Sequence, residues 1–297
     1  MIHYTMDIRQ TMLHLSGGLL LLLAPACTSE VEVDLEGGQP LEVTAEIVSS
    51  LSTRAVGATN YDKSSFSTDD EIQINDGSQT VTYRKDATNG WIPKTAGSSL
   101  TVSSLSTASS FSASYPEAFT SILQDQKSYE NFWQSNKLEA KGSNVTLSSN
   151  KVNFTFIPAA AKITISINYA SVGGATTKYK NVTATLAGNG IRTGASSSET
   201  IDMLHTGDNT VASDKHTFVC ILRPGANISF TLSVSRTSES SSTPESTQQT
   251  FTQSAYTFEA SKNYIYNFTS SDELILNSVE VMGFTETTVP DNPVSAT

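Results

Sequence analysis

The chain has 297 residues, a formal net charge of −11 and only 16% charged residues. This length allows one large or two ordinary domains, and the usual domain size favours two of about 100–150 residues each. The acidic balance argues against nucleic-acid binding, because phosphate contacts require clustered Lys and Arg. Abundant β-branched and aromatic residues predict an all-β fold.

The first 26 residues have the pattern of an export signal. Arg9 precedes the short apolar run "GGLLLLLAPAC", which is too short to span a bilayer. The small residues Ala24 and Ala26 before Cys27 resemble the lipobox of bacterial lipoproteins, in which the Cys is acylated and becomes the mature N-terminus. An ordinary secretory signal with an incidental Cys27 is the alternative.

Residues 27–54 are predicted to form a tether and a first strand. The acidic stretch "TSEVEVDLEGGQP" resembles the surface-export signal of Bacteroidetes lipoproteins, although by composition alone a solvated linker is the better explanation. The following segment "LEVTAEIVSSL" places Leu41, Val43 and Ile47 on one face and polar residues on the other. This period of two predicts a half-buried strand.

Short alternating or apolar segments continue to the C-terminus, separated by turn residues such as Asn89-Gly90 and Pro224-Gly225. Many short strands with such turns predict β-sandwiches. A boundary near Ile157-Pro158 gives two sandwich domains, 55–157 and 158–297. The predicted strands are "EIQIND", "QTVTYRK", "SSFSASYP", "NVTLSSNKVNFTF", "AKITISINY", "KNVTATLAG", "TFVCILRP", "ISFTLSVSR", "SAYTFEA", "NYIYNFT" and "LILNSVEVMGF".

Two segments have a different character. Residues 117–142 are long enough for a helix, but their apolar spacing is irregular, so their form stays open. The polar stretch "TSESSSTPESTQQT" predicts a long exposed hairpin loop.

The sequence offers little for catalysis. His205 and His216 lack neighbouring Cys or paired carboxylates at metal-ligand spacing, and we predict a surface position for both. Cys220 lies in an uninterrupted apolar run and is predicted to be a core thiol. We therefore predict no enzymatic activity, no metal and no cofactor. A β-sandwich hydrolase, whose two carboxylates meet only in the fold, is the alternative.

Several segments, in their order, resemble the fimbrillin family, the type V pilins of Bacteroidetes. They are the signal and Cys27, the acidic tether, the first strand, "STRA" with Arg54, "FSTDDEIQI", "YRKDATNGWIP", "FSASYP", "AAAKITISI", "LRPG" and the closing "ASKNYIYNFT…ILNSVEVMGF". The resemblance covers nearly the whole chain. Asp69-Asp70 stands where the family usually has Gly-Asp, and Phe284 where Trp is common.

This resemblance implies two tandem transthyretin-like β-sandwich domains and a structural pilus subunit or fimbrial adhesin at the cell outer membrane or fimbrium. The subunit would travel as a lipoprotein whose first strand fills its own N-terminal domain. An Arg-specific, trypsin-like protease would then remove that strand by cutting between Arg54 and Ala55. A strand from another pilin subunit would fill the vacated groove, linking subunits head to tail.

Local sequence supports this site, since Arg54 is the only Arg or Lys between Arg9 and Lys63 and lies among small residues. An unremarkable surface Arg is the alternative.

The candidate donor strand is the segment "ELILNSVEVMGF", with four candidate anchors. Two alternating phases meet between Leu276 and Val279, which predicts a bend or bulge and leaves the register open. A non-polymerising outer-membrane lipoprotein that binds glycan or another surface ligand is the alternative function, and the position in a pilus (stalk, tip or anchor) stays open. The anchors are Leu274, Leu276, Val279 and Val281.

Overall fold

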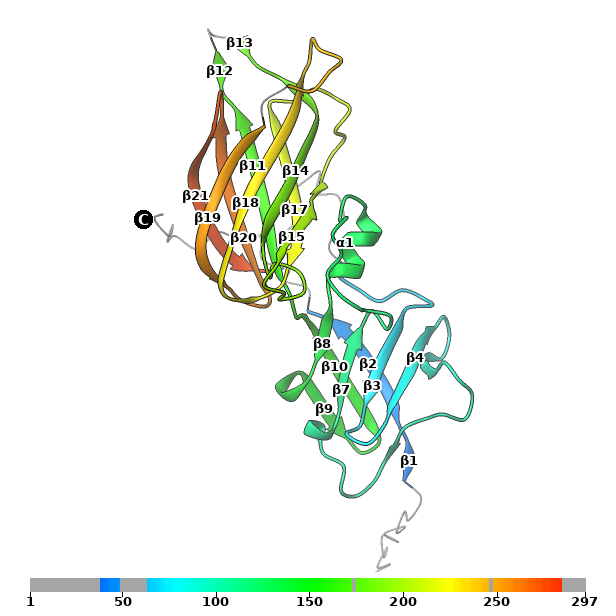
Figure 1. The fold of residues 1–297 in the computed structure, drawn as a ribbon. Helices are drawn as coiled ribbons and strands as arrows, with labels where there is room; N and C mark the ends of the chain where they lie inside the picture. Colours follow the sequence, from blue (N-terminus) through cyan, green and yellow to red (C-terminus); the bar gives the residue numbers. More distant parts are fainter. Residues whose placement is uncertain (1–37, 49–62, 173–174, 246–247, 285–297) are drawn as a thin grey trace, which may run out of the picture. The chain divides into compact units, whose positions relative to one another are not determined.

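The computed structural model describes residues 38–48, 63–172, 175–245 and 248–284. Most of this described part is β-strand, in agreement with the predicted all-β fold, and only one short α-helix occurs in it (Figure 1). No helix among the described residues has the length and apolar content that a membrane crossing would require.

Strands β1 to β10 and the helix form the N-terminal part. Their bounds are β1 Gln39–Pro40, β2 Glu42–Ile47, β3 Glu71–Asn75, β4 Thr80–Asp86, β5 Gly90–Pro93, β6 Thr101–Val102, β7 Ser112–Tyr115, α1 Tyr129–Ser135, β8 Leu138–Ala140, β9 Val145–Ser148 and β10 Lys151–Pro158, with short 3₁₀ turns η1 at Ala108–Ser110 and η2 at Gly142–Asn144.

The N-terminal sheet closes on itself. Its strand order is β2-β5-β4-β3-β7-β8-β10-β9, and an additional pairing joins β2 to β10. This gives a barrel-like arrangement around one apolar core that includes Ile72, Tyr83 and Phe154. Pairing of β2 with both β5 and β10 covers the edges that these two strands would otherwise leave open.

Strands β11 to β21 form the C-terminal part. Their bounds are β11 Ala161–Tyr169, β12 Ser171–Val172, β13 Ala175–Thr176, β14 Tyr179–Asn189, β15 Ser198–Asp202, β16 Leu204–His205, β17 Lys215–Leu222, β18 Gly225–Ser238, β19 Gln249–Phe258, β20 Lys262–Ser270 and β21 Leu274–Gly283.

Two sheets share the C-terminal core. A five-stranded sheet, β16-β17-β11-β20-β21, faces a four-stranded sheet, β15-β14-β18-β19 (Figure 1). Their inner faces contribute fully buried side chains such as Ile165, Leu232 and Phe268. Alternation of apolar and polar residues along these strands produces one buried and one outer face, as the sequence predicts.

Strand β17 has an uninterrupted apolar run because it is buried on both faces. Phe218 and Cys220 point into the core between the two sheets. Val219 and Ile221 point the other way, into a smaller cluster that also contains Phe132 of α1. Both faces of β17 are therefore covered, which is why the sequence of this strand does not alternate.

The segment 117–142, whose form the sequence left open, contains α1 and covers the face of β17 that carries Val219 and Ile221. Ser128 caps α1 by accepting a hydrogen bond from the Asn131 backbone N–H at 3.2 Å. The buried side chain of Gln126 donates through Nε2 to the Ile221 carbonyl oxygen at 2.9 Å, and its Oε1 accepts from the Ile221 N–H at 2.7 Å. A single amide thus pairs with the strand as a neighbouring backbone would.

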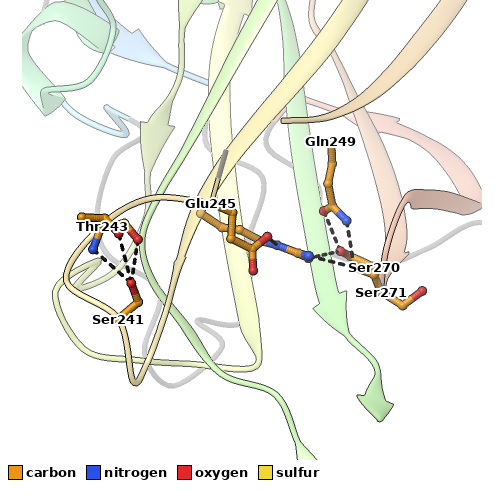
Figure 2. Close-up of polar contacts among 7 residues, drawn as sticks. Ser241, Thr243, Glu245, Gln249, Ser270 and Ser271 are labelled. Atoms are coloured by element: carbon orange, nitrogen blue, oxygen red, sulfur yellow. Dashed lines mark hydrogen bonds and ion pairs between the residues drawn. The ribbon is translucent and has the colours of Figure 1, made fainter. Parts of the chain in front are cut away.

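The polar hairpin between β18 and β19 occurs as predicted, but a buried arginine anchors it. Arg236 Nε donates to Glu245 Oε2 at 2.6 Å, and the guanidinium carbon lies 4.2 Å from the centre of the Tyr179 ring. Figure 2 shows Glu245, Gln249 and Ser270 converging around this contact, with Ser270 Oγ donating to Gln249 Oε1 at 2.7 Å. Arg236 Nη1 also donates to Ser270 Oγ at 3.0 Å, so Arg236 links the loop to the end of β20. These partners satisfy the guanidinium, because a buried cation requires hydrogen bonds.

Candidate strand-exchange site

Strand β2 occupies a slot between β10 and β5. It runs parallel to β10 in continuous register from Glu42 opposite Lys151 to Ile47 opposite Phe156. On its other side, one residue pair, Val43 opposite Trp91, joins it to β5. The strand is therefore held chiefly by β10.

The apolar face of the predicted first strand, from Leu41 just before β2 to Ile47, is buried as its sequence predicts. Leu41, Val43 and Ile47 keep only 6%, 8% and 7% of their exposure and belong to the N-terminal core. Burial of side chains of this kind contributes about 1.5–3 kcal/mol each. Three of them give roughly 5–9 kcal/mol as an upper figure, which is comparable with the about 5–15 kcal/mol that stabilises a whole domain.

Backbone hydrogen bonds fix both ends of the strand. The Glu42 N–H donates to the Asn150 carbonyl oxygen at 2.9 Å, and the Val48 N–H donates to the Phe156 carbonyl oxygen at 2.9 Å. Just before the strand, Asn150 Nδ2 donates to the Pro40 carbonyl oxygen at 2.9 Å. The slot therefore recognises an extended backbone along its length, in addition to the side chains.

Polar contacts occupy the outer face. The Thr44 hydroxyl contacts the Asn153 side chain, and the Thr155 hydroxyl donates to Glu46 Oε1 at 3.3 Å. Glu42 lies opposite Lys151 across the same face. Exposed contacts of this type contribute little stability, so the slot selects its strand mainly through the buried face.

The walls of this slot were not predicted from the sequence. Strand β10 has the pattern "KVNFTF", in which Val152, Phe154 and Phe156 lie opposite Val43, Ala45 and Ile47. The matching phase of two apolar patterns was visible in the sequence. Nothing in the sequence, however, specified a parallel pairing between segments about a hundred residues apart.

The proposed processing and lipidation sites, Arg54 with Ala55 and Cys27, lie outside the described residues. The described chain stops at Val48 after β2 and resumes at Lys63, where an ion pair joins Lys63 Nζ to Asp70 Oδ2 at 2.9 Å.

The candidate donor residues lie in β21, at the edge of the five-stranded sheet. Leu274 is buried, and the other three pack half-buried against the C-terminal core. Strand β21 pairs antiparallel with β20, and its register shifts between Asn267 and Phe268, so that Asn277 has no opposite residue. This confirms the predicted bulge between Leu276 and Val279. The three half-buried residues are Leu276, Val279 and Val281.

The surface position predicted for both histidines is wrong for His216, which keeps 2% of its exposure. Its Nε2 lies 3.0 Å from the Tyr179 carbonyl oxygen, which can only accept, so Nε2 carries the proton. His216 Nδ1 lies 2.9 Å from His205 Nε2, and His205 Nδ1 lies 2.8 Å from the Gly207 carbonyl oxygen. The sequence hid this pair because the neighbours of His216 come from β14 and the loop before β17.

Burial lowers the pKa of both imidazoles, and for His216 the nearby His205 lowers its pKa further. Within the described ranges, no group of three or more His, Cys, Asp or Glu side chains is arranged to hold a metal ion. Cys220 is fully buried, and burial raises the pKa of its thiol far above the usual value, as expected for a core residue.

Comparison with known proteins gives structural neighbours only. No family model matches the chain, and no curated protein matches its sequence. A candidate cell adhesion protein from Bacteroides ovatus is similar in structure, with a TM-score of 0.58 and 18% identity over 84% of this chain and 99% of that one.

A candidate cell adhesion protein from Bacteroides uniformis matches with a TM-score of 0.48 and 17% identity, over 83% of this chain and 98% of that one. A fimbrial anchor protein from Porphyromonas gingivalis matches with a TM-score of 0.39 and 11% identity, over 82% of this chain and 98% of that one. The chain is thus similar in fold to the Bacteroides ovatus protein. The structural neighbours are fimbrial and candidate cell adhesion proteins of Bacteroidetes, and at these identities the likeness concerns the fold.

Proposed function

We propose that this chain is a fimbrial subunit or fimbrial adhesin, exported as a lipoprotein and assembled by exchange of its first strand. The observation that carries the proposal is the place of the first strand, in which Leu41, just before β2, and Val43 and Ile47 of β2 are buried in the N-terminal core. Cleavage between Arg54 and Ala55 would separate β2 from all its partners, since β10 and β5 follow the cut in the chain.

The consequence of cleavage follows from the contacts. Loss of β2 opens the ring between β5 and β10, exposing the β10 backbone and apolar residues such as Phe156. An open sheet edge above an uncovered core is a template for an extended strand from another chain. Because donor and acceptor surfaces differ, repeated exchange builds an open filament. Two tandem transthyretin-like domains, divided near residue 157, are part of this proposal.

The trigger is tested at Arg54. Mild trypsin should release a product that begins at Ala55 and forms ladders of polymers, whereas Arg54→Ala should block both. Arg54→Lys is the matched control, because trypsin still cuts it while an Arg-specific protease in the cell does not. Polymers of normal length from Arg54→Ala would show that cleavage at Arg54 is not required for assembly. An uncut monomer on the cell surface would favour the non-polymerising lipoprotein.

The anchor is tested at Cys27. Each buried CH₂ of an acyl chain adds about 0.8 kcal/mol of membrane affinity, so loss of acylation should release the precursor from the outer membrane. Cys27→Ser should therefore abolish lipid labelling and outer-membrane fractionation of the precursor. Normal labelling of this variant would exclude Cys27 as the anchor.

We further propose β21 as the donor, which requires it to leave β20. Thr269 and Ile275 lie directly opposite each other in this pair, and a disulfide can join opposite residues of adjacent antiparallel strands. The double variant Thr269→Cys with Ile275→Cys should polymerise when reduced and stop when oxidised. Equal polymerisation in both states would show that β21 stays in place and that another segment is the donor.

A further inference from the structure

An open cavity of about 540 Å³ lies between the segment around Phe119, strand β8 and the loops that carry Arg192 and Arg223. Its size is within the range of small-molecule sites. Three basic side chains and one acidic side chain line it, although the chain as a whole carries a net charge of −11. The local charge is therefore opposite to the overall charge.

Arg223 is held in a fixed position. Its Nε donates to the Gly190 carbonyl oxygen at 2.9 Å. A β-carbon at Gly194, where φ is +86°, would lie 3.2 Å from Arg223 Cζ, and one at Gly225 would lie 3.3 Å from Nη2. Both positions hold glycine, and the missing side chain lets the Arg223 guanidinium pack directly on the backbone.

Arg192 is anchored in the same manner, because its Nε donates to the Ile122 carbonyl oxygen at 3.0 Å. Among the residues that the structure describes, no ion pair joins Arg192 or Arg223 to a carboxylate, and no hydrogen bond uses their terminal nitrogens. A guanidinium anchored through Nε keeps its two terminal nitrogens for a bidentate acceptor.

The single acidic residue of the cavity does not cancel these charges. Glu139 lies between two lysines, 2.6 Å from Lys137 Nζ and 2.8 Å from Lys141 Nζ. These contacts lower the pKa of Glu139 even though burial acts to raise it. Outside the lining, Glu199 accepts the Arg192 backbone N–H at 2.8 Å and offsets part of the Arg192 charge, so Arg223 carries the larger uncompensated charge.

The rest of the wall combines an aromatic ring with free hydroxyls. Phe119 lines the cavity beside Thr120 and Ser121, with Lys137 Nζ 5.9 Å from the centre of its ring, and neither hydroxyl has a hydrogen-bond partner within the described ranges. An apolar ring face next to hydroxyl donors and acceptors suits a pyranose, which has an apolar face and a hydroxylated rim.

We propose that this cavity binds an acidic sugar, with its carboxylate held by Arg192 and Arg223 and its ring against Phe119. The assignment holds whether or not the chain polymerises, because none of these residues belongs to β2, β5 or β10. Such a site would make the protein an adhesin for glycans that carry uronic or sialic acids.

The test is calorimetric titration of the full chain at low salt with glucuronic acid and with its uncharged analogue glucuronamide. Glucuronic acid should bind at least about tenfold more tightly, since hydrogen bonds to a charged group are the stronger ones. Arg223→Gln and Arg192→Gln should each lower its affinity by about tenfold or more. Arg84→Gln is the matched control, because Arg84 lies on β4 and is partly exposed.

Circular dichroism and thermal melting should show that each variant is folded. If Arg223→Gln does not fold, the affinity of Arg192→Gln for glucuronic acid tests the proposal alone. Equal affinity for the acid and the amide, or no binding at millimolar concentration, would overturn the proposal. Acetate competing as well as glucuronic acid would overturn the sugar class. Loss of affinity in Arg84→Gln equal to that in Arg192→Gln would overturn the site itself.

Discussion

Strands β2 and β21, one near each end of the described chain, are attached to their sheets in different ways. β2 pairs in parallel with β10, a strand more than a hundred residues away, and in a single residue pair with β5. β21 pairs antiparallel with β20, which immediately precedes it, and forms the outer edge of its sheet. β2 closes a sheet, whereas β21 ends one.

The difference bears on which strand can be exchanged. The contacts of β2 are non-local, so a second chain can supply the same strand without changing the connection between neighbouring strands. β21 belongs to a hairpin, whose short connection holds the two strands together at small entropic cost. A donor role for β21 therefore requires the hairpin to open, whereas an acceptor groove requires only the loss of β2.

The largest expected effect comes from removing β2. A chain that lacks residues 1–48 should lose the unfolding transition of the N-terminal part, because three buried side chains leave the core. A synthetic peptide of residues 39–48 should restore that transition, whereas the same peptide with Val43→Asp and Ile47→Asp should not. Removal of residues 274–297 should leave the N-terminal transition in place. The measurement is thermal melting by circular dichroism, and an unchanged melt without β2 would contradict the comparison.

One isoleucine in each strand allows a more direct comparison of β2 with β21. Ile47 keeps 7% of its exposure in β2, whereas Ile275 keeps 49% in β21. Ile47→Ala should lower the free energy of unfolding by about 2–5 kcal/mol, because it leaves a cavity. Ile275→Ala should change it by less than about 0.5 kcal/mol. Urea denaturation measures both, and equal losses would show that exposure does not govern the two strands.

The two parts should also differ in their response to pH. No histidine lies between residues 38 and 158, whereas His205 and His216 are both in the C-terminal part. Their folded pKa values are lowered, so the unfolded chain binds more protons and stability rises with pH. The C-terminal part should be fully stabilised above about pH 6.5 and lose stability as the pH falls below it.

Each imidazole should contribute at most about 1.4 kcal/mol per pH unit, the limit for one proton bound more by the unfolded chain. Melting of each part between pH 7.5 and 5.5 measures the difference. His205→Asn with His216→Asn should flatten the profile of the C-terminal part. A profile that keeps its slope in this double variant would assign the dependence to other groups.

The smallest effects are expected from exposed polar contacts on both strands. Thr155→Val removes the hydrogen bond to Glu46 beside β2, and Asn277→Ala removes a 2.8 Å hydrogen bond to Thr269 beside β21. Each should change the free energy of unfolding by less than about 0.5 kcal/mol. A loss above about 1 kcal/mol at either position would show that the outer faces also specify these strands.

Strands with clear alternation were predictable, and those without it were not. The periods of "KITISIN" and "KNVTATLAG" predicted β11 and β14, which the structure confirms. Strand β8 spans three residues inside a segment of irregular pattern, and β15 is the polar stretch "SETID". A strand this short or this polar carries too few apolar residues to show a period, so only its neighbours reveal it.

By itself, the sequence determined the all-β class, the buried face of the first strand, the bulge in β21 and the core position of Cys220. Each of these depends on a local pattern of apolar and polar residues, and such a pattern can be recognised from the order of residues along the chain. Only the tertiary structure decided that β2 lies parallel to β10, that His216 is buried against His205, and that Arg192 and Arg223 share a cavity. Contacts of this kind join segments far apart in the chain, and their energy depends on packing and burial that no local pattern encodes.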